Sequence, residues 1–428
     1  MLEEVVEVAF KKKEKKVVTA YDKESIDKTI DVIRSVMKDP TCIFKMSEFP
    51  VTVDFRSTGS FVLDYAAGGG YPKGRLVSSQ GGENSGKSTT ALLSIAAAQR
   101  AGEKPCVWID AEHTFDPAWA TVLGVNVDDL YLVQPDMPAE KVWSLMYMLL
   151  KSCHFSIIVL DSLDALVSAA EMAGEEDTMS ATDQVSGLAK LNTKAMRLII
   201  GSKVLATSET TVIVIQQLRD KIGGYNPSGT PQTTTTGGRS LKHNYSQIMK
   251  FRKGEIQMKG TDPVGQEIII KIDKNKVGSP YKTACLMLGY GTGIDLIDEL
   301  FKIGKTLGII INRGPYYSLV DPGTGELLTD HDGTPLKWQG EVKFKAMMIE
   351  DAEKNEGVVT YWIYDRVEEF IKGGTKTPVS QEPEEEVGEP DELSDEEART
   401  IEAAAKKKGS GGRSRKSKGP VDAPPKSE

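Results

Sequence analysis

The stretch "GGENSGKST", residues 81–89, follows the apolar-leaning run "RLVSSQ" and precedes "TALLSIAAAQR", whose apolar residues have helical spacing. It fits the pattern G-x-x-x-x-G-K-[ST], whose glycines let backbone N–H groups point at phosphate oxygens. The strand before it and the helix after it are the context that this pattern requires. The sequence therefore predicts a nucleotide-phosphate site made of Gly81, Gly82, Glu83, Asn84, Ser85, Gly86, Lys87, Ser88 and Thr89.

Two carboxylates follow apolar strands farther along the chain. Lys87 is expected to bridge the β- and γ-phosphates and Ser88 to ligate Mg²⁺. Asp161 ends "SIIVLD" and is expected to hold the Mg²⁺ shell, with a helix cap as the alternative. Glu112 lies two residues past "CVWID" (106–110), where it could orient and deprotonate a water; a plain surface residue is the alternative.

Short apolar runs alternate with helical segments between the phosphate motif and residue 218, including a long helical stretch over 180–206. This alternation is typical of a mainly parallel sheet covered on both faces. From residue 247 the pattern changes to successive strands, which predicts an antiparallel extension of the sheet. The fold class is therefore α/β, with a small α+β module over 294–372.

Length and composition set the remaining boundaries. A chain of 428 residues exceeds the usual size of one domain. We expect an N-terminal segment (1–56), an ATPase core (57–293), the C-terminal module (294–372) and a tail (373–428). The tail is acidic in "QEPEEEVGEPDELSDEE" and then basic and rich in small residues, so it predicts disorder. It is either a solubilising extension or a tethered polyanion that competes with DNA for basic surface.

Other features exclude several protein classes. The chain has no run of eighteen apolar residues and no signal-peptide pattern, which predicts a cytoplasmic protein without a membrane partner. Four widely spaced cysteines predict buried free thiols rather than disulfides or a zinc cluster. The net charge of −9 is unevenly placed, so it does not exclude a nucleic-acid partner.

Several strings together are more specific than the phosphate motif. The segments "CVWIDAEHTFDPAWATVLGV", "IIVLDSLDAL", "TTTTGGRSLK" and "IDKNKVGSP" follow "GGENSGKST" in order. With them, the chain resembles the RecA family of ATP-dependent DNA recombinases, bacterial or phage, over roughly residues 22–320. The resemblance implies ATP and Mg²⁺ as cofactors and a core with an N-terminal polymerisation helix, here "ESIDKTIDVIRSVMKD" (24–39).

The resemblance also implies roles at the nucleotide. Glu112 becomes the catalytic base, and Trp119 stacks on adenine, although by itself Trp119 would be a core residue. Gln217, at the end of "VIVIQQ", becomes the γ-phosphate sensor, with a solvated glutamine as the alternative. Lys274 and Lys276 become cations that reach a neighbouring subunit's ATP; otherwise they are alternate residues on an exposed strand.

The segment 219–242 is predicted to be a long structureless loop that binds DNA phosphates. Its small residues and threonines permit close approach, and its cations supply charge. By resemblance, Ile222 wedges between bases and two glycines grip the DNA backbone. Residues 171–190 match the family's first DNA-binding loop only loosely, and Arg197, on the helix after them, is a further DNA contact. The predicted DNA-binding residues are Arg197, Arg219, Lys221, Ile222, Thr236, Gly237, Gly238, Arg239 and the secondary-site cations Arg252, Lys253 and Lys271.

Two positions depart from the family pattern: His243 stands where a phenylalanine is usual, and Ile269 where a cation is expected. The function hypothesis is a recombinase that polymerises on single-stranded DNA with ATP and Mg²⁺ and pairs it with a homologous duplex. Single-strand-binding and loading proteins are further candidate partners. The alternatives are a hexameric helicase or motor on the same core and an ATP-switched accessory binding protein.

Overall fold

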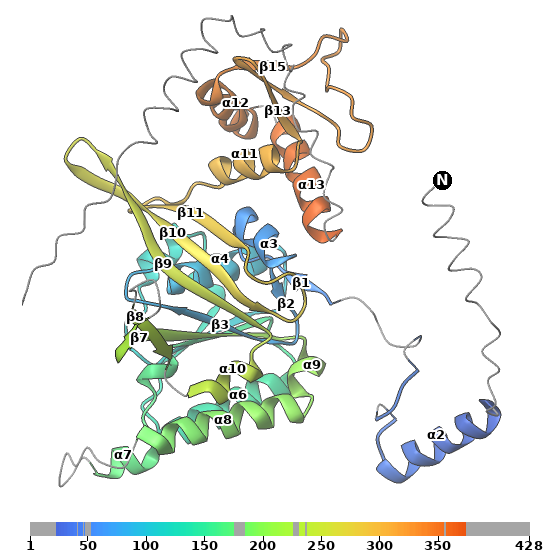
Figure 1. Cartoon of the computed structure of the whole chain (residues 1–428), viewed down its shortest axis with the longest axis vertical. Coiled ribbons are helices and arrows are strands. Elements are labelled where there is room, and N and C mark those ends of the chain that lie inside the picture. The colour runs from blue at the N-terminus through green and yellow to red at the C-terminus, as the bar shows by residue number, and fades with distance from the viewer. Residues whose placement is uncertain are drawn as a thin grey trace, which may run out of the picture. The chain divides into compact units, whose positions relative to one another are not determined.

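The computed structural model describes residues 23–40, 42–45, 47, 53–174, 185–225, 231–235, 238–354 and 357–373. Its centre is a ten-stranded sheet (Figure 1). In spatial order the strands are β12 (Gly293–Ile294), β11 (Thr283–Gly289), β10 (Asp262–Asn275), β9 (Gln247–Lys259), β3 (Leu76–Gly81), β7 (Thr211–Tyr225), β6 (Ile157–Asp161), β4 (Cys106–Asp110) and β5 (Leu130–Val133), with β8 (Pro231–Thr235) paired to β7.

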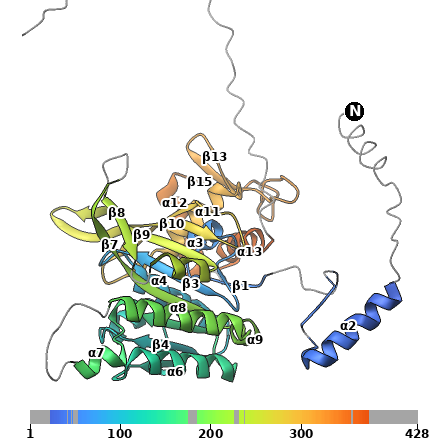
Figure 2. The same ribbon diagram turned by 60° about the horizontal axis from the view of Figure 1, so that its bottom comes forward.

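The half of the sheet from β3 to β5 is parallel, and β3 also pairs in parallel with β9. β4 and β6, inside this half, read as continuous buried runs because their apolar side chains face helices on both sides of the sheet. Val77 and its neighbours on one face pack against α4 (Lys87–Arg100), and Leu76 and its neighbours on the other face pack against α6 (Ala139–Ser152) and α8 (Val185–Gly201). Figure 2 shows α6 and α8 side by side along that face.

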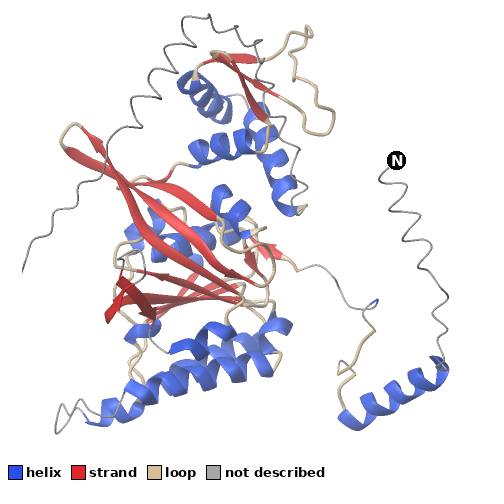
Figure 3. Ribbon diagram, in the orientation of Figure 1, coloured by secondary structure: helices blue, strands red, loops and turns tan. Residues whose placement is uncertain are grey.

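The other half of the sheet is antiparallel, as the sequence predicted. β9, β10, β11 and β12 pair in succession, and β9 and β10 form a long hairpin with three register shifts. Figure 3 shows these strands running on from the parallel strands. The structure therefore confirms the predicted fold class, a mainly parallel core with an antiparallel extension.

Shorter elements connect these strands. β1 (Phe55–Arg56) pairs with β2 (Tyr71–Pro72), and α2 (Lys23–Met37) covers most of the predicted N-terminal helix. The remaining elements between β1 and β9 are α3 (Phe61–Ala67), α5 (Pro117–Val122), η2 (Val127–Asp129), η3 (Leu163–Ala165), α7 (Ala169–Gly174), α9 (Val204–Ser208) and α10 (Gly238–Asn244).

The C-terminal module is a small α+β unit built on an aromatic core. Phe301 and Phe344 pack with Tyr317 between the helices and a three-stranded sheet. Glu299 joins the module to α3, because its carboxylate accepts hydrogen bonds from Ser60 Oγ at 2.9 Å and the Phe61 amide at 3.0 Å. The elements are α11 (Leu296–Thr306), β13 (Ile310–Arg313), β14 (Tyr316–Leu319), β15 (Lys337–Gln339), α12 (Glu341–Lys354) and α13 (Val358–Lys372).

Three sequence expectations need correction. The stretch over 219–242 is not structureless: β7 continues to Tyr225 and pairs with β8, because a run of β-branched threonines favours strand. The helix over 180–206 is two helices, α8 and α9, since Lys203 has a left-handed backbone (φ 58°). The cysteines are free, but only Cys106 is buried, and Cys42 and Cys285 are exposed.

In the described part of the chain, none of the helices is both long enough and apolar enough to cross a membrane. Apart from Gly373, the tail predicted over 373–428 lies outside the described residues.

Candidate active site

The phosphate motif forms the turn between β3 and α4. Gly86 is the N-cap of α4 and has φ +88°, and a Cβ there would lie 2.3 Å from Ile268 Cδ1. Asn84 also has a positive φ of 51°. Because Gly86 has no side chain to cap α4, the first amides of the helix are left for an external acceptor. The turn therefore has the form of an anion site at a helix amino end.

Lys87 points back over this turn. Its Nζ donates to the Gly82 carbonyl, and the residue is only 8% exposed. Burial lowers the pKa of Lys87, while Asp161 and then Glu112 oppose that shift. A partly desolvated ammonium that faces carboxylates and backbone carbonyls is suited to bind a phosphate.

Ser88 and Asp161 supply the oxygen ligands expected of a magnesium site. Ser88 Oγ donates to Asp161 Oδ2 at 2.8 Å. Burial, with Glu112 and Asp110 adding to it, raises the pKa of Asp161 to about 6, although the Ser88 hydrogen bond opposes the shift. Such crowding of negative charge fits a divalent cation.

Among the described residues, no group of three or more His, Cys, Asp or Glu side chains could hold a metal by itself. Mg²⁺ at Ser88 and Asp161 would therefore complete its shell with phosphate oxygens and water.

Glu112 lies beside the same carboxylate. Its backbone N–H donates to the Asp161 carbonyl at 3.3 Å, so the end of β4 is held against the end of β6. Its Oε1 accepts from Ser162 Oγ and, at 3.4 Å, from Gln217 Nε2. Glu112, Gln217 and Lys87, which are far apart in sequence, thus meet at the carboxyl edge of the sheet, where such folds bind ligands.

Gln217 marks the point where β7 leaves the sheet. It pairs with Gly81 of β3, and the next residue, Leu218, pairs with Thr235 of β8. Beyond Gln217, β7 and β8 form a two-stranded antiparallel ribbon. The predicted DNA-binding residues of the segment 219–242 lie on this ribbon and on α10. Arg219, Lys221 and Ile222 lie in β7, Gly238 and Arg239 lie in α10, and Thr236 and Gly237 lie outside the described residues.

Lys274 and Lys276 contact the end of α10. Lys274 Nζ donates to the Lys242 carbonyl at 2.6 Å, and Lys276 Nζ donates to the His243 carbonyl at 3.1 Å. Burial, and then the charge of Lys276, lowers the pKa of Lys274. Cations at a helix carboxyl end are favoured by its carbonyls. In a single chain, then, both lysines bind the helix that follows the ribbon.

Trp119 lies on α5, partly buried against the core. Asp116 caps that helix by accepting from the Ala118 and Trp119 amides. The position is compatible with both predicted roles, a core residue and a stacking surface.

Arg197 belongs to a basic stripe that the sequence analysis missed. Lys190, Lys194 and Arg197 are exposed on α8 and line one hollow with Thr193. Spacings of four and three residues put side chains on one helix face, and this spacing was the available signal.

The predicted secondary-site cations do not all share a face. Arg252 lies opposite Ile269 in the β9–β10 register, and Lys271 two residues on is also exposed, so these two share the face opposite to the buried Ile270. Lys253 lies opposite the buried Ile268 at a register shift, so it is not grouped with them.

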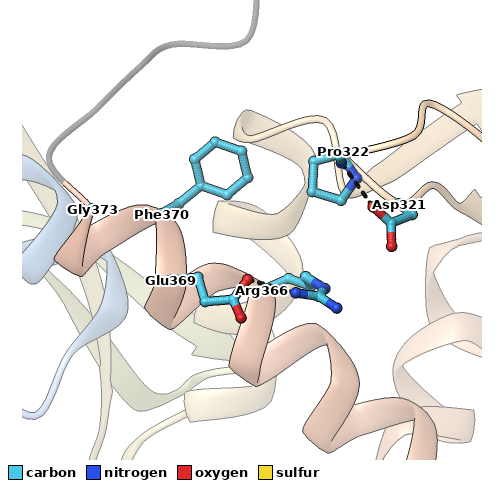
Figure 4. Close-up of a pocket in the computed structure, with 7 residues that line it drawn as sticks. Asp321, Pro322, Arg366, Glu369, Phe370 and Gly373 are labelled. Atoms are coloured by element: carbon cyan, nitrogen blue, oxygen red, sulfur yellow. Dashed lines mark hydrogen bonds and ion pairs between the residues drawn. The ribbon is translucent and has the colours of Figure 1, made fainter.

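A separate hollow lies on the C-terminal module, between α13 and the turn at Asp321 (Figure 4). Arg366 is paired with Glu369 at 2.6 Å. None of the residues that line it belongs to the phosphate motif or its carboxylates, so this hollow is not part of the nucleotide site.

A strand, a glycine-containing turn and a helix with Lys87, Ser88 and Asp161 at the carboxyl edge of a mainly parallel sheet define a phosphate-loop nucleotide-binding protein. The family model described as the RecA N-terminal domain matches residues 24–295. The chain therefore belongs to the RecA family of DNA recombinases, ATP-using proteins that bind DNA and form filaments.

Curated relatives agree with this assignment. Protein RecA of Fusobacterium nucleatum is 39% identical over 312 residues, which cover 71% of this chain and 79% of the relative. Protein RecA of Oceanobacillus iheyensis is 42% identical over 271 residues, which cover 63% and 75%. Protein RecA of Streptococcus equi subsp. zooepidemicus is 36% identical over 344 residues, which cover 77% and 88%.

Proposed function

We propose that this chain hydrolyses ATP, with Mg²⁺, in a manner that depends on single-stranded DNA, and that the nucleotide state governs how tightly the β7–β8 ribbon holds that DNA. The observation that carries the proposal is the contact of Gln217 Nε2 with Glu112 Oε1. Gln217 is the last residue of β7 paired with the main sheet, and the ribbon begins directly after it. A change at the ribbon and a change at the nucleotide therefore act on the same residue.

The proposed roles use these contacts and the family resemblance. Lys87 and the first amides of α4 would hold the phosphates, and Ser88 and Asp161 would hold Mg²⁺, which would offset charge on the phosphates. Glu112 orients water and accepts its proton. Gln217, within 3.4 Å of that carboxylate, positions it. Trp119 stacks on the base, and the segment 81–89 encloses the triphosphate.

The DNA is proposed to lie along the ribbon, α10 and the basic stripe of α8. Residues 219, 221, 222 and 236–239, with Arg197, Lys190 and Lys194, contribute charge, threonine hydroxyls and close backbone approach. These contacts read phosphates rather than base edges, so binding is expected to be nearly indifferent to sequence and steeply dependent on salt. Arg252 and Lys271 would contact the second DNA molecule, the homologous duplex. Lys253 is less well placed for this contact, because it does not share their face of the hairpin.

Assembly is proposed to complete the site. The amphipathic α2 docks one copy on the next, and a heterologous contact of this kind produces a helical filament. Lys274 and Lys276 would exchange the carbonyls of α10 for phosphates of the neighbouring copy's ATP. The division into segments 1–56, 57–293, 294–372 and 373–428 belongs to the same proposal, as does action on DNA in the cytoplasm.

The test is ATP turnover with and without single-stranded DNA. We expect a DNA-dependent increase in the wild-type chain and, for Glu112→Gln, a loss of about a hundredfold in turnover with ATP binding retained. Electron micrographs with DNA and a non-hydrolysable ATP analogue should show helical filaments rather than rings. A turnover rate that DNA leaves unchanged would refute the coupling.

A further inference from the structure

Asp164 is a half-buried carboxylate that the sequence analysis did not select. It lies in η3, directly after Asp161 and Ser162. Those two residues contact Ser88 and Glu112. Asp164 is therefore on the same short turn as two groups of the nucleotide site, but its own side chain points to a different element.

That element is β7, at the place where it loses a strand neighbour. On one side β7 pairs with β3 as far as Gln217, but on the other side it pairs with β6 only as far as Val214. The Gln217 amide donates instead to Asp164 Oδ2 at 2.7 Å. A side-chain oxygen thus takes the place of the strand carbonyl that β6, ending at Asp161, does not supply.

The two carboxylate oxygens of Asp164 differ in their partners. Its Oδ1 is buried and has no hydrogen-bond partner among the described residues. Burial raises the pKa of Tyr245, and the charge of Asp164 adds to this shift. A buried acceptor without a partner costs free energy. We therefore attribute the presence of Asp164 to the hydrogen bond that its Oδ2 accepts from the Gln217 amide.

We infer that Asp164 is a positioning residue for ATP hydrolysis: by binding the Gln217 amide it fixes the root of the DNA ribbon so that the Gln217 side chain reaches Glu112. This inference rests on the proposed roles of Glu112 and Gln217. It adds a second link between the two sites, because η3 begins two residues after Asp161, the proposed magnesium ligand. Movement of the ribbon then reaches Glu112 through Gln217, and movement of the Asp161 segment reaches the ribbon through Asp164.

The test compares full-length variants that differ in one acceptor. Asp164→Asn keeps an oxygen for the Gln217 amide, Asp164→Leu has a similar volume without one, and Asp164→Ala removes both. Asp128→Ala, at an exposed residue of η2, is the control. Turnover with and without a poly-dT oligonucleotide gives kcat, KM for ATP and the DNA stimulation, and thermal unfolding gives Tm.

For the Leu and Ala variants we expect DNA stimulation to fall about tenfold, while KM for ATP stays within about twofold of the wild-type value. The Asn variant should keep at least about half of the stimulation. The double variant Asp164→Leu, Gln217→Ala should lose no more stimulation than Gln217→Ala alone, because Asp164 acts through Gln217.

Two results would overturn this inference and leave the proposed function standing. The first is DNA stimulation of the wild-type size in the Leu and Ala variants. The second is an equal loss of DNA stimulation in the Asn and Leu variants that follows their loss in Tm. A wild-type chain that DNA does not stimulate would overturn the proposed function and this inference with it. If the Ala variant does not fold, the Asn and Leu pair decides the question, since the two differ chiefly in the acceptor.

Discussion

Two groups of buried carboxylates in this molecule differ in their partners. At the nucleotide site Asp161 accepts from Ser88 Oγ and faces Lys87 and Glu112. At the junction of α3 and α11, Asp64 accepts from Ser57 Oγ at 2.6 Å and the Thr58 amide at 2.7 Å, while Glu299 accepts from Ser60 and Phe61. Burial raises the pKa of Asp161 and of Asp64 to about 6 and that of Glu299 to about 7.

The comparison shows that a raised pKa does not by itself identify an active site. The acids at the junction receive hydroxyl and amide donors from their own chain, so their geometry is complete. Asp161 lies with Ser88, Glu112 and an ammonium beside a helix amino end, where the proposed triphosphate and cation would supply further contacts. What distinguishes the active site is a set of partners that only a ligand completes.

The largest expected effect tests the cation at the nucleotide site. Lys87→Ala should lower ATP turnover about a thousandfold or more, with or without DNA, because it removes the buried ammonium that lies over the phosphate turn. Steady-state hydrolysis measures it. Lys104→Ala, at an exposed lysine, is the control. Turnover above about a tenth of wild type would contradict the role of Lys87.

A smaller effect separates the two regions directly. Asp161→Asn should raise the Mg²⁺ concentration needed for half-maximal turnover about tenfold, because a neutral amide oxygen is a weaker ligand. Asp64→Asn should leave that concentration unchanged and lower Tm. Turnover against Mg²⁺ concentration and thermal unfolding are measured on both variants. The comparison fails if the two variants shift the Mg²⁺ requirement equally.

The smallest effect concerns stability and pH. Burial raises the pKa of Glu299 in the folded protein to about 7, from an ordinary value of 4.5. At a pH between these two values, Glu299 is protonated in the folded protein and ionised in the unfolded chain. Wild-type stability should therefore fall as pH rises through this window. Glu299→Gln removes this loss, since its amide can donate to Ser60 Oγ and its oxygen can accept from Phe61.

The Tm difference between Glu299→Gln and wild type should accordingly move in favour of the variant by about 2–4 °C between pH 5 and pH 8. Asp64 titrates in both chains and largely cancels in this difference. Parallel Tm curves for the two chains across that range would show that Glu299 ionises normally in the folded state.

The strand ends and the phosphate turn were predictable because each is a local pattern. "CVWID" is β4 to the residue, and the motif at 81–89 has its strand and helix. The ribbon was missed because glycine and proline outweighed the run of threonines in the prediction. The basic stripe on α8 was missed because charges at helical spacing on a surface are common. The prediction grouped Lys253 with Arg252 and Lys271, but which cations share a face depends on the register of the hairpin, and its register shifts leave no mark in composition.

By itself, the sequence determined the fold class, the phosphate turn and the family, and it selected Lys87, Ser88, Glu112, Asp161 and Gln217 as candidate site residues. These are properties of short segments, in which side-chain periodicity and glycine content limit the backbone. Only the tertiary structure decided that Asp164 binds the Gln217 amide and that Asp64 and Glu299 close a junction. Such contacts join residues distant in the chain, and they exist because the sheet brings strand ends together in an order that no local pattern contains.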